Sequence, residues 1–518
     1  MKLLEKHSPV SLLASALVLL WIIYRAYLFI SFRQKYNFPN LVPGGLPLFG
    51  NMFQIPTDTA ERRLYLQDLA TKYGEMYCTE FTLKVGSNYS IFINSQRVAN
   101  EILDKRGARY ISRQNLPMPG DVASGGKRVV FMPYGNLWKW ERKLIHEIIG
   151  PGNRNIFAPL QDMESRTLLY DYLQQPDLWH QAHARYASSL IMSMVYGRRT
   201  KLGDPNVDRI IDTNNEIMKM FEPGSSLIDA FPFLAYIPLP RSIQPWRWWG
   251  DRVFEASKRN FIEEYEGLME REAQGKHVTC FMSEFMRNGR DKALDYESTV
   301  FLGGSLIEAG SDTTRVALNQ LMAGAALFPD WIQRARNDLD GVCGANAERL
   351  PTASDIANLP YIKAISKEVL RWNISLPEIP HSLIEDDSFE GYNIPAGTSV
   401  MWNSWGLHMS PSEYEQPERF WPERFMNDDV DKPIKGHLAF GTGRRVCPGW
   451  TIASNSLHLL IARVVYCFDF HQVPGHPIPV GKPFDIGTEK PYQVKITARS
   501  PDHAVLVKRE CEESAHFE

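Results

Sequence analysis

The sequence predicts a mainly helical protein that carries a small β-sheet near its N-terminus. Apolar residues recur with helical spacing over residues 62–73, over long stretches of 168–272 and over 297–328. Short strand patterns at residues 79–85 and 91–93 predict the sheet. A chain of 518 residues could hold two or three ordinary domains. Nothing in the interior composition marks a linker, however, so we expect one large globular unit.

The composition describes an ordinary folded protein and excludes some partners. The net charge of -3 shows no basic excess that would indicate nucleic acid as a partner. The six cysteines lie far apart and form no C-x-x-C pair, which argues against a zinc site and against a dense disulfide framework. We therefore expect reduced thiols in a cytosolic environment.

The first thirty-odd residues differ from the rest of the chain. Residues 12–32 approach the roughly 20 apolar residues that span a bilayer, and Arg25 near the end of this stretch can snorkel. A secretory signal peptide is the alternative, but no small-x-small cleavage site precedes Arg33. Basic residues are more numerous on the C-terminal side. We therefore expect residues 1–35 to be a single-pass anchor in the endoplasmic reticulum membrane, with the catalytic domain in the cytosol.

Proline and glycine recur over residues 36–51, where they prevent a helix from continuing. This stretch is predicted to be a stiff hinge, although a simple linker would behave in nearly the same way. The catalytic domain would then occupy residues 52–505, followed by a polar tail over 506–518.

Two helical segments place polar side chains on one face. Trp138 and Arg142 stand four residues apart, so an indole N–H and a guanidinium could both donate to a carboxylate. Glu368 and Arg371 stand three apart and could form an ion pair. Both pairs are also typical of ordinary amphipathic helices, in which such side chains are solvated.

The long helix predicted over residues 297–328 contains the unusual run Ala309-Gly310-Ser311-Asp312-Thr313-Thr314. Small residues at Ala309 and Gly310 would thin the helix and leave room for a diatomic ligand. A Thr313 hydroxyl that bonds the carbonyl four residues earlier would bend the helix locally, and Asp312 could supply protons. A helix with a cap-like polar cluster is the alternative.

The stretch FGTGRRVCPG, residues 440–449, offers a single cysteine from a glycine-rich loop. Glycines let the backbone come close to a flat ligand. Cys447 lies just ahead of a predicted helix over 450–468, so helix N-terminal amides should favour its thiolate. An inert thiol is the alternative. A dinucleotide loop is excluded, because the third glycine and the preceding strand of the G-x-G-x-x-G fingerprint are missing.

The spacing F-x-x-G-x-R-x-C-x-G in this loop resembles the cysteine-ligand signature of the cytochrome P-450 monooxygenases. The order of the motifs agrees with that family from about residue 39 to residue 500. The resemblance implies the cytochrome P-450 fold, mainly α with a small β-rich lobe, and haem b (iron protoporphyrin IX) as cofactor. It implies that the thiolate of Cys447 is the axial ligand of the iron.

The resemblance also assigns roles to the other motifs. Asp312 and Thr313 would deliver protons to dioxygen. Glu368 and Arg371 would join a third partner, Arg424, and hold the cysteine loop. The residues expected to bind the haem are Trp138, Arg142, His381, Phe440, Gly443, Arg445 and Gly449.

These features predict a membrane-anchored haem-thiolate monooxygenase that inserts one oxygen atom of O2 into a lipophilic small molecule. Electrons would come from NADPH through a separate cytochrome reductase, because the chain offers neither a flavin nor a nicotinamide site. Lys139, Lys143 and Arg444 are candidate docking charges for this reductase. The sequence around residues 385–397 is similar to filamentous-fungal members that act in secondary metabolism or oxidise aromatic compounds.

Two further regions are predicted to contact the substrate or the membrane. The segments predicted to line the substrate pocket, which are mixed and mainly apolar, are residues 114–133, 306–309, 376–379 and 489–492. The aromatic and proline-rich stretch 231–249 is predicted to dip into the bilayer beside the anchor, with a buried aromatic cluster as the alternative.

Two other functions stay open on the sequence. A haem-thiolate isomerase or dehydratase would rearrange a peroxide without a reductase, although Asp312 and Thr313 argue against it. A membrane haem carrier or electron-transfer module would need a second axial ligand opposite Cys447.

Overall fold

The structure is a computed structural model. It describes residues 34–45, 50–80, 89–153, 156–222, 225–289, 293–372, 379–480 and 492–516, together with scattered positions between 13 and 31. The predicted anchor lies largely outside the described residues. Within them, we find no helix that combines the length and the apolar character needed to cross a bilayer.

Most of the molecule is a helical body around one long central helix, α11 (Tyr296–Leu327). Its closest neighbour is α6 (Trp179–Tyr196), and α9 (Trp248–Ala273) also packs along it. The other helices of this body are α4 (Asn136–Ile149), α5 (Ala158–Gln174), α7 (Pro205–Lys219), α8 (Leu227–Ala230), α10 (Phe281–Arg287), α12 (Asp330–Cys343), α13 (Pro360–Arg371), α15 (Trp450–Cys467) and α16 (Pro501–Ala515).

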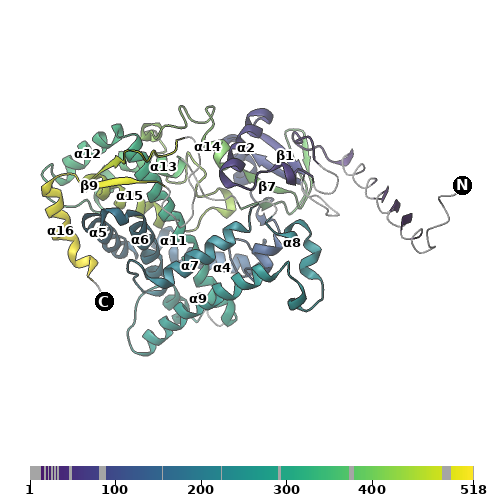
Figure 1. Ribbon diagram of the computed structural model, residues 1–518, viewed down its shortest axis with the longest axis horizontal. Coiled ribbons are helices and arrows are strands. Elements are labelled where there is room, and N and C mark those ends of the chain that lie inside the picture. The colour runs from purple at the N-terminus through teal and green to yellow at the C-terminus, as the bar shows by residue number, and fades with distance from the viewer. Residues whose placement is uncertain are drawn as a thin grey trace.

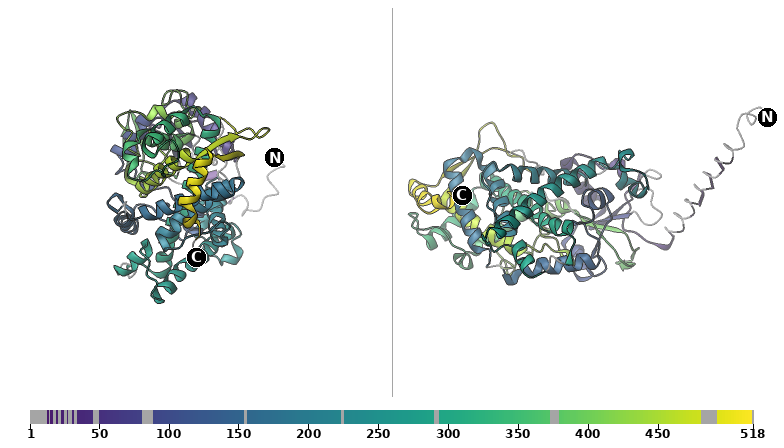
Figure 2. Two further views of the ribbon diagram at one scale, coloured as in Figure 1. Left: turned by 90° about the vertical axis from the view of Figure 1, so that its left-hand side faces the viewer. Right: turned by 90° about the horizontal axis from the view of Figure 1, so that it is seen from below.

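A five-stranded sheet lies at one end of the molecule, opposite the end that carries α16 (Figures 1 and 2). The strand order is β1-β2-β7-β4-β3, and the β2–β7 pair alone is parallel. The strands are β1 (Met76–Glu80), β2 (Tyr89–Ile93), β3 (Ser112–Arg113), β4 (His381–Ser382) and β7 (Ser399–Trp402). The register sets Arg113 opposite His381.

Two small hairpin-like sheets and several short helices complete the fold. β5 (Asp387–Phe389) pairs with β6 (Tyr392–Ile394), and β8 (Phe468–Gln472) pairs with β9 (Val494–Ala498). The remaining helices are α2 (Thr59–Tyr73), which packs beside the sheet, α3 (Gln96–Ala99) and α14 (Ser404–His408). Single helical turns are η1 (Met52–Gln54), η2 (Asn100–Lys105), η3 (Pro117–Val122), η4 (Pro151–Asn153), η5 (Pro176–Leu178), η6 (Pro232–Tyr236), η7 (Arg241–Ile243), η9 (Asp355–Asn358), η10 (Pro422–Phe425) and η11 (Gly443–Arg445).

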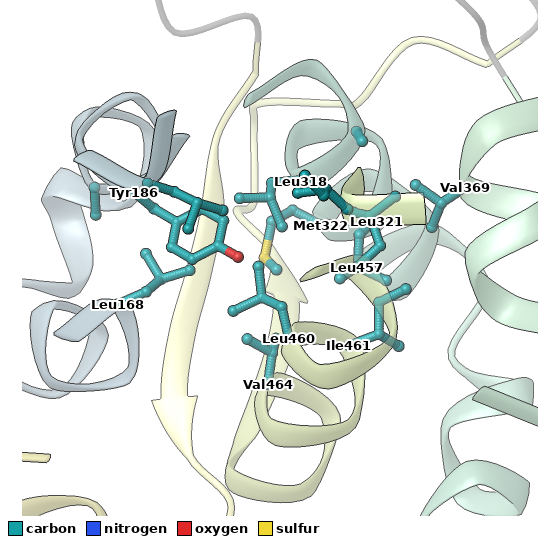
Figure 3. Packing of buried hydrophobic residues seen from close by; sticks show 14 of the residues in the cluster. Leu168, Tyr186, Leu318, Leu321, Met322, Val369, Leu457, Leu460, Ile461 and Val464 are labelled. Carbon is teal, nitrogen blue, oxygen red and sulfur yellow. The ribbon is translucent and has the colours of Figure 1, made fainter. Parts of the chain in front are cut away.

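The main hydrophobic core joins α11 to α15. Leu318, Leu321 and Met322 of α11 meet Leu457 and neighbouring apolar residues of α15 (Figure 3). Buried apolar side chains of this kind each contribute roughly 1.5–3 kcal/mol. The Asp312 segment and the cysteine loop are therefore attached to helices that share one hydrophobic core.

Glycines in α11 serve close helix packing. A Cβ at Gly310 would lie 2.6 Å from Ile191 of α6, and a Cβ at Gly304 would overlap the ring of Phe261 of α9. The prediction that Gly310 leaves room for a diatomic ligand is therefore wrong, because the space that a side chain at this position would occupy is filled by Ile191 of α6. Ala309, in contrast, is exposed.

The predicted polar tail over residues 506–518 is also wrong for the part that the structure describes. Residues 501–515 form α16, whose first turn is capped by the Ser500 side chain. The helix packs on α5 and buries Leu506, Val507 and Cys511. The tail is thus an element of the folded domain.

The predicted hinge begins inside the sheet region. Asn40 and Val42 each form a backbone hydrogen bond with Cys78 of β1, at 3.0 and 2.9 Å. Beyond them, Gly44 and Gly50 adopt positive φ, a conformation that glycine accepts without strain. The first half of this stretch is therefore pinned to the domain.

Candidate active site

The cysteine loop is closed by its own backbone. The Cys447 N–H donates to the Phe440 carbonyl at 2.8 Å. Gly441 and Gly443 lie in the left-handed region, with φ of 67° and 64°. A Cβ at Gly443 would collide with the carbonyl of Leu103 in η2. Gly443 thus seats the loop against a neighbouring turn, whereas nothing described lies close to the open side of Gly449.

The Cys447 thiol experiences opposing influences on its pKa. Burial raises the pKa, while the backbone N–H of Gly449 and the charge of Arg142 lower it. The predicted contact with a helix-terminal amide is therefore present, but burial outweighs it, and the thiol is favoured in the chain alone. Coordination to a metal deprotonates a thiol outright.

Three arginines converge beside this loop. Arg445 donates to the carbonyls of Ile111 and Met132 at 2.6 and 2.9 Å, and its guanidinium carbon lies 3.8 Å from the centre of the Trp138 ring. Arg142 donates to the carbonyl of Val446, next to Cys447. The third arginine, Arg113, donates to the carbonyl of Ile379 at 2.6 Å.

The buried positive charges of this arginine cluster favour the binding of an anion. Burial and the neighbouring guanidinium groups lower the pKa of Arg113 to about 9 and that of Arg445 to about 8. The His381 ring donates from Nδ1 to the Tyr110 carbonyl at 2.8 Å, and burial together with Arg113 and Arg445 holds its pKa well below the usual range. Among the described residues, no carboxylate pairs with Arg113, Arg142 or Arg445. Their recorded hydrogen-bond partners are backbone carbonyls, so the cluster fits a ligand with two carboxylates.

Arg113 was not predicted from the sequence. Its neighbours in sequence carry no recognisable pattern, and its place in the cluster depends on the pairing of β3 with β4 across more than 260 residues. Predicting Arg113 would have required the pairing of β3 with β4, two short strands that are distant in sequence.

The Asp312 segment of α11 has two contrasting sides. Thr313 donates to the Ala309 carbonyl at 2.9 Å, as predicted, and these two residues are the exposed positions between residues 298 and 327. Asp312 is buried instead. It accepts from Arg315 at 3.0 Å and from Asn214 of α7 at 3.4 Å. Proton delivery by Asp312 would therefore require this pairing to loosen.

Glu368 and Arg371 of α13 form a fully buried, two-pronged ion pair, with both contacts at 2.7 Å. Arg424 lies 3.3 Å from the same carboxylate, as predicted. Arg419, in the other copy of the P-E-R-F pattern, is placed near Asp330 instead. The choice of Arg424 as third partner thus agrees with the geometry.

This ion-pair network reaches the cysteine loop through a histidine that the sequence did not single out. Arg371 donates to the His408 carbonyl at 2.9 Å. The His408 ring in turn accepts the backbone N–H of Leu438 at 3.1 Å, two residues before Phe440. The chain of contacts fixes the start of the loop to α13.

A cavity of about 410 Å³ opens between residues 113–133 and Ile379. It is bordered by Phe131, Phe221 and Tyr236 among others. Many of the residues 114–133 therefore line a pocket as predicted, whereas residues 306–309, which were also predicted to line it, are not among the lining residues of this cavity. Tyr492 does not line it either, because it stacks on Trp179 in the main core; residues 376–378 and 489–491 lie outside the described part.

These features define the class of the protein. The site combines a lone cysteine on a loop, a nearby cluster of cations suited to two carboxylates, and an adjoining cavity. This combination fits a haem-thiolate protein. Cys447 would hold the iron, and the propionates would be held by Arg113, Arg142, His381 and Arg445.

Comparisons with known proteins agree. Residues 40–496 match the family model for cytochrome P450, so the chain belongs to this family. It is 33% identical to the cytochrome P450 monooxygenase verL of Clonostachys rogersoniana, over 90% of this chain and 88% of the relative, and 32% identical to aneD of Aspergillus aculeatus, over 95% and 94%. A solved zebrafish cytochrome P450 shares the fold, with a TM-score of 0.64 at 21% identity over 85% of this chain and 100% of its own.

The chain is accordingly a cytochrome P450 monooxygenase with haem b as cofactor, and it uses O2, a substrate and a redox partner. When bound, the haem supplies the activation of dioxygen from which one oxygen atom enters the substrate. The roles of individual residues in that reaction remain predictions.

Proposed function

We propose that this monooxygenase is anchored in the endoplasmic reticulum membrane, takes electrons from NADPH through a separate cytochrome reductase, and oxidises a lipophilic small molecule in fungal secondary metabolism or aromatic-compound oxidation. The observation that carries the proposal is the cavity beside the arginine cluster, whose wall includes Leu116, Phe131, Met132, Phe221 and Ile379. Apolar walls with a few polar groups are typical of sites for lipophilic ligands. The fungal monooxygenases among the relatives support the setting.

The proposed reductase surface is the side of the molecule that carries the cysteine loop. Lys139 and Lys143 are exposed on α4, and Arg444 is exposed in η11. Arg142 bridges α4 to the loop through Val446, so these charges lie on adjoining elements. Exposed charges of one sign steer association and make its rate depend on salt. Replacing the three by glutamine should slow reduction at low ionic strength and flatten its salt dependence.

The first test is the carbon monoxide difference spectrum of the reduced protein. Wild type and Cys280→Ala, which changes a buried cysteine elsewhere, should both give the red-shifted Soret band of a thiolate-ligated haem. Cys447→Ala should lose it. A band that persists in Cys447→Ala would remove the assigned ligand.

The proposed electron route has its own test. NADPH oxidation should require added cytochrome reductase and O2, and it should accelerate when a lipophilic substrate from a screened panel is present. Turnover of a peroxide without reductase would instead favour the isomerase alternative.

A further inference from the structure

The cavity wall is shared between two hydrophobic clusters. We call residues 114–133 the wall segment. In its first part, Met118, Val122 and Ala123 pack with apolar residues of α7, α8 and α9. At its end, Val129 and Met132 belong to the main core around α11 and α15. Residues 124–128, between these two parts, belong to neither cluster, so their position relative to α11 depends on polar contacts.

A buried ion pair ties this middle part of the wall segment to α11. Arg128 of the wall segment contacts both carboxylate oxygens of Glu308 in α11, at 2.8 and 2.9 Å. The two side chains are only 2% and 8% exposed. The nearby contacts of Lys127 with Asp295 and Glu297 are longer, at 3.6 Å, and more exposed, so they hold the wall less firmly.

Arg128 lines the cavity but has no donor left for a ligand. Besides Glu308, it donates to Ser257 of α9 at 2.8 Å, to the Ala123 carbonyl at 2.7 Å and to Ser124 at 3.1 Å. These contacts account for the donors of the guanidinium fork. The geometry is that of a clamp between the wall segment, α9 and α11.

The other end of the clamp lies at the reactive stretch of α11. Glu308 immediately precedes Ala309, whose carbonyl accepts from Thr313 and which shares with Thr313 the exposed side of the helix. We propose that Arg128 and Glu308 are positioning residues that set the distance between the wall segment and the Ala309–Thr313 side of α11, and thereby determine the size and orientation of the ligands that the cavity accepts.

Single and paired substitutions separate this role from simple stability. Arg128→Met or Glu308→Gln leaves an unbalanced group in a buried site, which destabilises the protein, whereas the double variant Arg128→Met/Glu308→Leu removes both charges. The double variant should therefore regain thermal stability relative to the single variants but should not regain the position of the wall.

The test titrates the full-length, haem-loaded protein with imidazole and with N-dodecylimidazole and follows the Soret shift. Imidazole needs little more than access to the iron, so its affinity should stay close to wild type in all three variants. N-dodecylimidazole must fill the cavity, and its affinity should fall by about tenfold, a typical size for a coupled contact. Hydrogen exchange should also become faster in peptides from the wall segment, with peptides from α6 unchanged.

Glu164→Gln is the matched control, because Glu164 and Arg185 form an equally buried pair at 2.6 Å whose residues lie outside the cavity lining. This control should lower thermal stability without changing the ratio of the two affinities. The proposal is overturned if Glu164→Gln changes that ratio as much, if both affinities fall together in the clamp variants, or if exchange in the wall segment is unaffected. If a single variant fails to load haem, the same measurements on the double variant decide whether the proposal holds.

Discussion

Neighbouring residues of α11 have opposite environments, and this contrast shapes the expected proton chemistry. Thr313 is exposed, while Asp312 is buried against Arg315 and Asn214. A carboxylate in such a pair can exchange partners and pass a proton, or it can simply hold two helices together. Asp312→Asn keeps the shape of the side chain and removes both its acid–base function and its charge toward Arg315, so turnover and stability must be measured together to separate the roles.

We expect Asp312→Asn to lower turnover per haem by about a hundredfold, the lower end of the range for a positioned acid or base. Haem content and the carbon monoxide spectrum should stay unchanged. Turnover per haem and thermal stability would be measured together. A variant that is less stable but turns over normally would assign Asp312 to structure alone.

Glu141 provides a pH-dependent prediction. Burial raises the pKa of this carboxyl from 4.5 to about 8, and one of its oxygens lacks a hydrogen-bond partner among the described residues. The unfolded chain releases this proton near its ordinary pKa, while the folded chain keeps it until about pH 8. Between these values the folded state binds more protons, so stability falls as the pH rises.

Glu141→Gln removes the titration and should leave stability at pH 5 nearly unchanged. At pH 8 and above the variant should be more stable than wild type, by an amount on the order of a few kcal/mol. Melting temperatures of both proteins from pH 5 to pH 8.5 check this, with the exposed Glu147→Gln on the same helix as control. A difference that does not change with pH would contradict the assigned cause.

At the scale of elements, α13 holds the cysteine loop through relayed contacts. Glu368 pairs with Arg371 and Arg424, and Arg371 reaches His408, whose ring holds the backbone of Leu438. Removing one member of a buried ion pair costs about 3–5 kcal/mol, because the remaining charge loses its partner. This loss of stability would weaken the contacts that position the loop of Cys447.

Glu368→Ala and Arg371→Ala should therefore lose haem rather than merely turn over more slowly. Arg419→Ala is the matched control. Arg419 belongs to the other copy of the P-E-R-F pattern, but its side chain contacts the exposed Asp330 at 3.7 Å, so haem content should be normal. The ratio of Soret to protein absorbance in purified variants measures this. Normal haem content in Glu368→Ala would show that the loop does not depend on the network.

The elements differ in how far the sequence could predict them. The Glu368–Arg371 pair and the Thr313–Ala309 bond depend on spacing within one helix, so local periodicity was sufficient. The sequence predicts a polar tail where α16 lies, although Val507 and Cys511 stand four apart, which is a helical spacing, and are both buried. The side of α11 on which Gly310 packs could not be predicted, because that depends on the position of α6.

The same distinction applies to the site. Cys447 and the residues around it are adjacent in sequence, and their spacing was informative. Arg113 and the clamp of Arg128 and Glu308 depend on contacts between segments that are 180 or more residues apart. One sequence without relatives contains no signal for such pairs, because neither partner has a distinctive neighbourhood.

At the scale of the whole molecule, apolar side chains gather on the surface near α8. Figure 1 places α8 at the same end of the molecule as the five-stranded sheet. The exposed residues there are Leu227, Tyr236, Leu239, Ile243 and Trp248. Trp246 and Trp249, which were predicted to enter the bilayer together with Trp248, are partly buried in the cluster of the wall segment, and their indole N–H groups donate to Leu234 and Glu216. The buried alternative thus holds for these two tryptophans.

If the exposed surface near α8 contacts the bilayer, a protein lacking residues 1–38 should still sediment with phospholipid vesicles. Changing Leu227, Ile243 and Trp248 together to serine should release it, because each exposed apolar side chain would contribute through its burial in lipid. Trp246→Ser should instead lower the melting temperature and leave vesicle binding intact, since this side chain already packs inside the protein. Sedimentation at two salt concentrations would separate apolar insertion from attraction of basic residues such as Arg241 to anionic lipid. Equal binding by the triple serine variant and the parent would place membrane association in the first 38 residues alone.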